Sequence, residues 1–320
     1  MSSEERLNGL KKFAAQVTGL EDPRLQLVSG DASFRKYYRA EGRIFVDAPP
    51  ATEKNAEFVE YSGIYRRAGI NVPEVLQADL DQGYLCITDL GSTMFSQYHT
   101  PQNEESLYSR ACDLAVRISQ IEHSFPIYDR PFIERELQIF SDWYVGAHAG
   151  IELTPAEQNV WSSVCEMLVQ NDLQQPAGTM HRDFHCRNIM ITDNEQLAVI
   201  DFQDTVTGPV TYDLVSLLKD CYVTLEPSLR ARLTARAYEK LRAAGTVDCS
   251  LEQFTEFMDL TGMQRHLKAI GIFCRLLYRD GRDGYLQYLP RTFGYVAETA
   301  AKYPQFRDFA SLLADRFTKR

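Results

Sequence analysis

The stretch His181 to Asp213, HRDFHCRNIMITDNEQLAVIDFQDTVTGPVTYD, decides the fold, and the rest of the chain can be interpreted outward from it. Within it, two short apolar runs with a polar turn between them predict a β-hairpin. Asn188 stands just before the first run and Asp201 just after the second, so a hairpin would bring both side chains to the same end of its ladder. Asp183 precedes Asn188 by five residues.

Two carboxylates and one amide in this order are typical of phosphoryl transfer. Transfer of a γ-phosphoryl group requires magnesium to neutralise phosphate charge, and a carboxylate to orient the attacking hydroxyl and accept its proton. Asp183 is the candidate base. Asn188 and Asp201 offer the hard oxygen ligands that Mg²⁺ prefers. The stretch therefore predicts a site that uses ATP and Mg²⁺.

The same stretch resembles the catalytic core of the protein-kinase-like fold, in which an H-x-D-x-x-x-x-N loop precedes a D-F-G turn. Gln203 stands where that turn usually has glycine. The chain is most similar to the aminoglycoside phosphotransferase and choline kinase group, and within it to the bacterial anomeric sugar kinases of cell-wall (peptidoglycan) recycling. The segments that carry this resemblance are GDASFRKYYR, VDAPP, HRDFHCRNIMI, IDFQDTVTGPVTYDLVSLLKDCY and QRHLKAIGIFCRLLYRDGRDGYLQYLPR. The resemblance implies an ATP- and Mg²⁺-dependent kinase that phosphorylates N-acetylmuramic acid or N-acetylglucosamine at the anomeric hydroxyl.

Length and composition are those of an ordinary globular protein. The 320 residues suffice for two domains or one bilobal unit, and the net charge of −10 disfavours a nucleic-acid partner. The first residues do not form a signal peptide, and no apolar run is long enough to span a membrane. The seven cysteines are scattered and odd in number, which favours a reducing compartment. We therefore expect a cytoplasmic protein without an obligate protein partner.

The N-terminal part predicts a small strand-rich lobe that covers the nucleotide. Strands are expected at 25–28, 37–40 and 43–46, and the loop between the first two is a candidate phosphate-binding segment. The candidate contacts in this loop are Ser29, Gly30, Ser33 and Arg35; a plain hairpin turn is the alternative.

The resemblance also implies an N-lobe lysine for the α and β phosphates, and that lysine is missing here. Asp47 stands near its expected place. Arg35 is the first candidate to replace it and Lys36 the second, and Glu57 on a helix expected at 53–67 is the candidate acidic partner, unless it is only solvated surface.

A hinge between lobes is expected after the strand at 83–88. The resemblance assigns adenine contacts to the backbone of Asp89 and Leu90. The expected organisation is an α+β, bilobal protein-kinase-like fold, with a small β-rich N-lobe at 1–91 and a large, mainly helical C-lobe at 92–320.

Apolar residues at helical spacing predict the helices of the C-lobe, at 104–122, 155–170, 212–222, 229–244 and 251–277. Asp213 either caps the third of these helices or, as the resemblance suggests, steadies the catalytic loop. His181 is interpreted as a core histidine that braces the same loop.

The best indication of the substrate is a basic stripe on the last of these helices, formed by Arg265, Lys268, Arg275 and Arg279. Arg265 and Arg275 are candidates to bind the lactyl carboxylate of N-acetylmuramic acid, because a guanidinium recognises a carboxylate through two parallel hydrogen bonds. Gln264 and His266 are candidate hydroxyl or amide contacts. The alternative is that the stripe is only a solvated face.

Other chemistries fit less well. A zinc site at His181, His185 and Cys186 lacks the general-base glutamate of the usual motif, and a Cys186 nucleophile would need a base that is not its sequence neighbour. A kinase-shaped protein without turnover remains an alternative, because of the missing lysine and Gln203. A kinase for aminoglycosides, choline or homoserine is another, although polycationic acceptors would require an acidic pocket.

Overall fold

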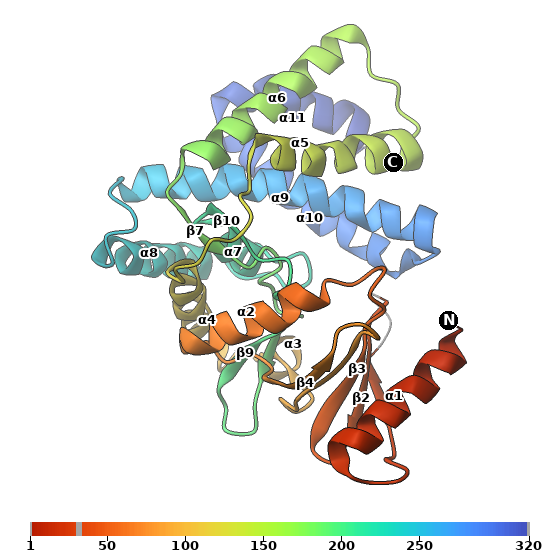
Figure 1. The fold of residues 1–320 in the computed structure, drawn as a ribbon. Helices are drawn as coiled ribbons and strands as arrows, with labels where there is room; N and C mark the ends of the chain where they lie inside the picture. The colour runs from red at the N-terminus through yellow and green to blue at the C-terminus, as the bar shows by residue number, and fades with distance from the viewer. Residues whose placement is uncertain (1, 30–33, 319–320) are drawn as a thin grey trace. The chain divides into compact units, whose positions relative to one another are not determined.

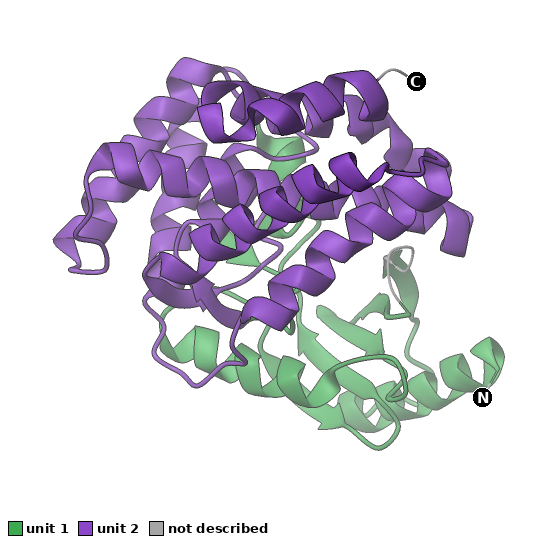
Figure 2. Ribbon diagram, turned by 90° about the horizontal axis from the view of Figure 1, so that it is seen from above, with its two compact units in different colours: residues 1–100, 187–205 green, residues 101–186, 206–320 purple. Residues whose placement is uncertain are grey.

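The structure is a computed structural model that describes residues 2–29 and 34–318. The chain divides into two compact units, shown in different colours in Figure 2. Unit 1 contains residues 1–100 and 187–205, and unit 2 contains residues 101–186 and 206–320. The chain thus leaves unit 2 after Cys186, completes unit 1, and returns at Val206.

The larger sheet of unit 1 has five antiparallel strands in the order β1-β2-β3-β5-β4. They are β1 (Gln26–Ser29), β2 (Lys36–Ala40), β3 (Arg43–Asp47), β4 (Val75–Asp79) and β5 (Tyr84–Thr88), labelled in part in Figure 1. The central strands are the most apolar, and β3 and β5 are almost wholly buried. The strands expected at 25–28, 37–40, 43–46 and 83–88 are therefore confirmed to within one residue at each end.

Helix α1 (Ser3–Thr18) packs its apolar side on this sheet. Its start is fixed by a capping box, in which Ser2 and Glu5 each accept a backbone hydrogen bond from the other. Leu10, Phe13 and Ala14 are buried against the strands. These apolar residues recur at the spacing of an amphipathic helix.

A second sheet of unit 1 contains the expected hairpin. Its strands β8 (Ile189–Ile191) and β9 (Leu197–Val199) pair in register, and the short β6 (Thr93–Met94) adds to the other edge of β8. Helix α2 (Asn55–Arg67) contacts the segment that follows this hairpin through Phe58 and Tyr65, whose rings lie against Phe202. Helix α3 (Phe95–Tyr98) follows β6.

Unit 2 is mainly helical. Its helices are α4 (Glu104–Ser119), α5 (Arg130–Ile139), the π-helix η1 (Phe140–His148), α6 (Pro155–Gln174), α7 (Tyr212–Leu218), α8 (Pro227–Ala243), α9 (Leu251–Asp280), η2 (Asp283–Tyr288), α10 (Leu289–Lys302), η3 (Pro304–Phe306), α11 (Arg307–Leu312) and η4 (Leu313–Phe317). One antiparallel pair, β7 (Ala177–Met180) with β10 (Val206–Pro209), brackets the segment that crosses to unit 1. No helix of the described residues is long and apolar enough to cross a membrane.

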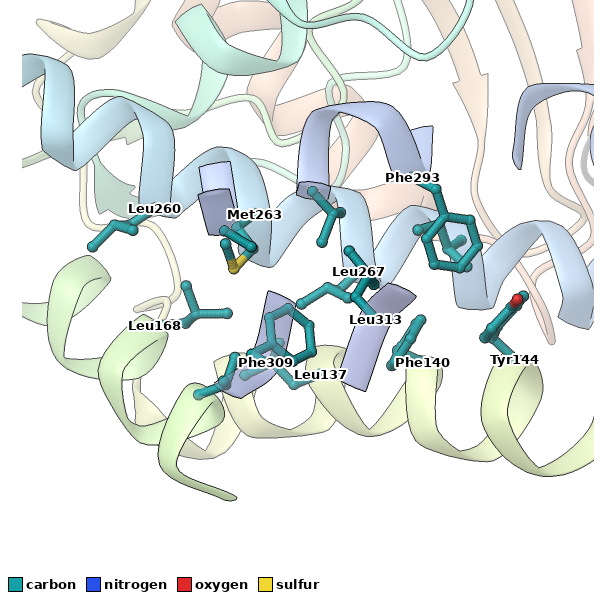
Figure 3. Close-up of a cluster of buried hydrophobic side chains, with 14 of the residues drawn as sticks. Leu137, Phe140, Tyr144, Leu168, Leu260, Met263, Leu267, Phe293, Phe309 and Leu313 are labelled. Carbon is teal, nitrogen blue, oxygen red and sulfur yellow. The ribbon is translucent and has the colours of Figure 1, made fainter. Parts of the chain in front are cut away.

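The long helix α9 is the centre of the unit 2 core. Figure 3 shows Leu260, Met263 and Leu267 of α9 facing side chains from the surrounding helices. Gly271 lets α9 approach the end of α5 closely, because a Cβ at this position would lie 2.4 Å from the carbonyl oxygen of Ile139. The polar residues of α9 that are described below are therefore held on a rigid element.

The N-terminal segment of unit 1 runs to residue 100, and the β8–β9 hairpin joins this unit because β8 pairs with β6. The interpretation of the basic stripe as a solvated face is wrong for Arg265 and Lys268, which are both buried.

Candidate active site

The catalytic loop, residues 181–188, follows β7, and a buried carboxylate fixes its start. Asp213 accepts hydrogen bonds from the backbone N–H of His181 at 2.7 Å and of Arg182 at 3.0 Å. Both bonds run to the loop, and the start of α7 has no side-chain cap. Burial raises the pKa of the Asp213 carboxyl above its ordinary value, although these donors and His181 partly offset it.

Arg182 adopts a left-handed backbone conformation, with φ of +76°. A residue other than glycine rarely takes this conformation, which costs about 1–3 kcal/mol and persists only where the surroundings hold it. Here the two hydrogen bonds to Asp213 hold the backbone, and His181 is fully buried with its ring edge against Phe184. The strained turn immediately precedes Asp183.

A second carboxylate fixes the end of the loop within unit 2. Asp220 accepts the backbone N–H of Cys186 at 3.0 Å with one oxygen and the backbone N–H of Tyr222 at 2.8 Å with the other. Between the two anchors, the N–H of His185 donates to the carbonyl of Asp183 at 3.0 Å. Asp220 was not among the residues predicted from the sequence.

The Asp183 side chain lies in a strongly positive environment. Burial alone would raise the pKa of its carboxyl, but Lys268, His185 and Arg182, followed by Arg265, hold that pKa well below its usual range. The carboxylate is therefore ionised throughout the neutral pH range. An ionised oxygen is what a base requires in order to accept a hydroxyl hydrogen.

Glu136 on α5 organises these cations, and sequence reasoning missed it. It is 4% exposed and binds Lys268 Nζ at 2.8 Å and Arg182 Nη2 at 2.9 Å. Tyr128 Oη donates to it at 2.7 Å and Gln264 Nε2 at 3.2 Å. Burial would raise the pKa of Glu136, but the two cations lower it, so the carboxyl is ionised.

Arg265 is the least satisfied cation of this group. It is 6% exposed, and its Nη1 donates to Cys221 Sγ at 3.9 Å, a weak acceptor. Its Nε has no hydrogen-bond partner among the residues that the structure describes. Burial would lower its pKa, but Cys221, Tyr212 and Asp183 raise it, so the guanidinium stays charged.

The other predicted substrate contacts on α9 are placed differently. Gln264 and His266 are buried; Gln264 binds Glu136, and His266 shares a hydrogen bond of 2.8 Å with the Lys219 carbonyl and stacks on Tyr295. Burial, reinforced by Arg265, lowers the pKa of His266 to about 3. Arg275 is half-buried, and burial lowers its pKa too.

The predicted metal ligands come together in unit 1. The Ile200 N–H donates to the Asn188 carbonyl at 3.0 Å and so extends the β8–β9 ladder by one bond. Asn188 and Asp201, the residue after Ile200, therefore lie at the same end of the hairpin. Asn188 Nδ2 is 3.5 Å from Asp201 Oδ2. A half-turn of the Asn188 amide would present its oxygen instead, and this donor set of amide and carboxylate oxygen suits Mg²⁺.

Gln203 holds the Asp201 carboxylate. Its Nε2 donates to Asp201 Oδ1 at 2.7 Å. The left-handed residue of the turn is Asp201 itself, with φ of +65°, so the position of Gln203 does not require glycine. Within residues 2–29 and 34–318, no three His, Cys, Asp or Glu side chains are arranged to hold a metal, so the zinc site considered for His181, His185 and Cys186 is not formed.

Arg35 in unit 1 has an acidic partner, as expected, but the partner differs. Its side chain is 2% exposed, lies over the Phe58 ring and pairs with Glu53 at 3.1 Å. Glu57, the expected partner, is partly exposed one turn later on α2. Asp47, near the expected place of the lysine, binds Arg6 at 2.5 Å.

The other predicted nucleotide contacts lie in the loop after β1 and in the segment after β5. Gly30 and Ser33 lie outside the described residues, and Ser29 is described only as the backbone end of β1. Asp89 forms a two-pronged ion pair with Arg39, at 2.5 and 2.9 Å, and its Oδ1 also accepts the Gly91 N–H at 2.9 Å. This pairing fixes the segment that contains Leu90, which is partly exposed.

Comparison with solved structures confirms the expected fold. A choline/ethanolamine kinase family protein from Mesorhizobium loti matches with a TM-score of 0.63 at 15% identity, over 96% of this chain and 98% of that one. An ADP-bound aminoglycoside phosphotransferase matches with a TM-score of 0.60 at 12% identity, over 93% and 99%. The fold is the protein-kinase-like fold of these enzymes, with a sheet-rich N-terminal part and a helical C-terminal part.

Comparison with sequences goes further. Curated proteins called N-acetylmuramate/N-acetylglucosamine kinase are similar to this chain: that of Pseudomonas aeruginosa is 39% identical over 94% of this chain and 91% of its own length. That of Neisseria meningitidis serogroup B is 35% identical over 96% and 94%. The model of the phosphotransferase enzyme family matches residues 24–246, which include residues 181–188 and the turn at Asp201. The chain therefore belongs to the phosphotransferase enzyme family.

Proposed function

We propose that the protein is an ATP-dependent sugar kinase that phosphorylates the anomeric hydroxyl of N-acetylmuramic acid and N-acetylglucosamine in the cytoplasm, for peptidoglycan recycling. The observation that carries this proposal is the ionised Asp183 within a buried group of cations in unit 2. The similarity to N-acetylmuramate/N-acetylglucosamine kinases over almost the whole of each chain supports the choice of substrate.

Asp183 is the proposed base. The anomeric hydroxyl is more acidic than an ordinary alcohol because the ring oxygen withdraws electron density, so a carboxylate with a low pKa suffices to receive its proton. The acceptor oxygen bonds to the γ-phosphorus, the bond from that phosphorus to the β–γ bridging oxygen breaks, and ADP leaves. The sugar hydroxyl proton passes to Asp183.

Asn188 and Asp201 are the proposed ligands of magnesium. When bound, Mg²⁺ neutralises charge on the ATP phosphates. Gln203 keeps one Asp201 oxygen oriented through its 2.7 Å hydrogen bond. The two ligands lie on one hairpin end of unit 1, and only four residues separate Asn188 from Asp183 in the sequence.

Arg35 is the proposed substitute for the missing lysine. In kinases of this fold, a cation paired with a glutamate holds the α and β phosphates. Arg35, which is buried, forms a pair of this kind with the partly buried Glu53. The Ser29–Ser33 loop before Arg35 and the backbone of Asp89 and Leu90 are the proposed phosphate and adenine contacts.

Arg265 is the proposed partner of the lactyl carboxylate, with Arg275 as a second cation on the same helix. A buried guanidinium whose Nε has no partner gains two charge-assisted hydrogen bonds when a carboxylate arrives. The same cations make an aminoglycoside or choline acceptor unfavourable, because both are cationic. Gln264 and His266 support this group from within the core.

A coupled ADP-release screen tests the function. N-acetylmuramic acid, N-acetylglucosamine, an aminoglycoside, choline and homoserine are each offered with ATP and Mg²⁺, and the phosphate position of any product is read by NMR. We expect turnover with the two amino sugars and a 1-phosphate product. Binding of ATP without turnover on any acceptor would instead identify a non-catalytic protein.

Asp183→Asn should lower kcat by about 10²- to 10⁴-fold, the usual contribution of a general base, while ATP binding is retained. The matched control is Asp193→Asn, which makes the same change in the exposed turn of the β8–β9 hairpin. The control should keep wild-type turnover. Undiminished turnover in Asp183→Asn would remove Asp183 from its role.

A further inference from the structure

Five aromatic side chains of unit 2 form a connected cluster that the proposed function does not use. His185 meets Tyr222 edge-on, with ring centroids 5.3 Å apart, and Tyr222 meets Tyr288 at 4.9 Å. Phe273 of α9 contacts Tyr222, Tyr285 and Tyr288 at 6.4, 5.8 and 6.0 Å. We call Tyr222, Tyr285 and Tyr288, backed by Phe273, the tyrosine wall.

The side chains of the tyrosine wall are only partly buried. Phe273 is buried, whereas the three tyrosines are partly exposed. Tyr222 comes from the loop after α7, and Tyr285 and Tyr288 come from η2. All three rings contact Phe273, and Tyr222 also meets Tyr288 edge-on. Rigid rings that keep part of their surface open suit the recognition of a ligand that is apolar on one side and polar on the other.

The wall is tied to the catalytic loop by hydrogen bonds. The two oxygens of Asp220 accept the N–H of Cys186, three residues after Asp183, and the N–H of Tyr222. His185, whose N–H donates to the Asp183 carbonyl, touches the Tyr222 ring. A ligand resting on Tyr222 is therefore held at a fixed place relative to Asp183.

The tyrosine wall also adjoins Arg265. Arg265 Nη1 donates to the thiol of Cys221, the residue next to Tyr222, and Arg291 Nη1 donates to the Cys221 carbonyl at 3.1 Å. An aromatic face beside a buried guanidinium matches a pyranose with an anionic substituent, since the axial C–H bonds of a sugar ring are weakly positive and pack on the negative face of an aromatic ring.

We propose that the tyrosine wall is the subsite on which the acceptor sugar ring stacks, with Tyr222 as the principal contact. The inference rests on the proposed function and adds to it a contact that both amino sugars share. Arg265 would bind the carboxylate, which only N-acetylmuramic acid carries. The wall would bind the ring, which both sugars have.

The test compares Tyr222→Leu, which removes the ring but fills the space, with Tyr222→Phe, which keeps the ring and removes the hydroxyl. For Tyr222→Leu, KM for both sugars should rise about tenfold, while KM for ATP and kcat stay within about twofold of wild type. Tyr222→Phe should keep KM within about twofold. Tyr288→Leu is a second variant with the same expectation, and Tyr278→Leu, an exposed tyrosine on α9, is the matched control.

A binding measurement accompanies the kinetics. Protons of a sugar that stacks on an aromatic face shift upfield in the NMR spectrum, so the shift should appear with wild type and Tyr222→Phe and disappear with Tyr222→Leu, without ATP. Unchanged sugar KM in both leucine variants would overturn the inference. A joint rise of KM for sugar and ATP with a lower melting temperature would overturn it too, because that result indicates a packing role.

Failure of the proposed function would look different. If wild type phosphorylates neither amino sugar, the proposed function and this inference fall together. If wild type phosphorylates them and the leucine variants match it, only the tyrosine wall is excluded.

Discussion

At the scale of single residues, Arg265 shows how burial changes the meaning of a charge. On a surface, an arginine contributes little specificity, because water satisfies its donors. Here Arg265 is 6% exposed, its Nη1 donates to the Cys221 thiol, and its Nε has no partner among the described residues. Leaving such donors unsatisfied costs free energy, and an arriving carboxylate recovers it.

Arg265→Ala should therefore change selectivity. We expect kcat/KM for N-acetylmuramic acid to fall about 10- to 100-fold, the loss of a charge-assisted contact, and kcat/KM for N-acetylglucosamine to fall much less. Rates measured side by side with both sugars give the ratio. The control is Arg279→Ala, at the exposed end of the same helix, where the cation pairs with Asp280. Equal losses on both sugars would argue against a carboxylate contact.

Much of the catalytic loop could be predicted from single residues, and its supports could not. The spacing of Asp183, Asn188 and Asp201 marks a phosphotransfer pattern, and the hairpin that aligns the last two follows from local apolar runs. Glu136 and Asp220 carry no such mark, because one acidic residue in a helical or loop segment is usually solvated. Only the tertiary fold reveals that they are buried against the loop.

At the scale of elements, the contact between α5 and α9 depends on a buried ion cluster. Glu136 on α5 binds Lys268 on α9 and Arg182 on the loop. Buried ions repay their desolvation only while each has its partner, so removing one partner costs far more than removing both. The cluster therefore links the two helices to the position of the catalytic loop.

Glu136→Gln should lower the free energy of unfolding by about 3–5 kcal/mol, because Lys268 and Arg182 lose a buried counter-ion. Adding Lys268→Met to that variant should recover part of the loss. Urea denaturation of the two single variants and the double variant measures the coupling. Glu134→Gln, in an exposed pair on the same helix, should change stability by less than about 1 kcal/mol. Additive losses in the double variant would contradict the buried pair.

The elements differ in how much the sequence shows. Strands with apolar alternation and helices with regular apolar spacing were predicted closely, as at 104–122 against the observed α4. Helix α5 was missed although Asp129 caps it and a proline lies in its first turn, signals that the sequence does contain. Strands β7 and β10 contain glycines and a proline, and they form because each finds the other, so local propensity does not indicate them.

At the scale of the whole molecule, stability should depend on pH through Asp172. This carboxyl is buried between α6 and α9, accepts hydrogen bonds from Thr261 at 2.7 Å and Asn171 at 3.1 Å, and burial raises its pKa to about 7. A raised pKa means that the folded protein binds the proton more tightly than the unfolded chain. The contribution of the protonated Asp172 carboxyl to the free energy of unfolding is thus complete below about pH 4, and it is lost as the pH rises through about 7.

Asp172→Asn should therefore raise the melting temperature more at pH 8 than at pH 5, and not at all below about pH 4, since an amide needs no proton to stay neutral and still accepts from Thr261. The gain in free energy of unfolding should reach roughly 2–4 kcal/mol at pH 8. Scanning calorimetry across this range measures it, with the exposed Asp308→Asn as control. A variant whose pH dependence parallels that of wild type would refute the assignment.

The double passage of the chain between units has a consequence for dissecting the protein. Residues 187–205 complete unit 1 from within the sequence of unit 2, and strand β8 depends on β6 at Thr93–Met94 for one of its edges. Neither half exists as one uninterrupted fragment. Expression of the helical half alone requires that the hairpin be excised and Cys186 be joined to Val206 by a linker. A plain truncation at residue 100 would leave the hairpin without its neighbouring strand, and its unpaired backbone donors would favour aggregation.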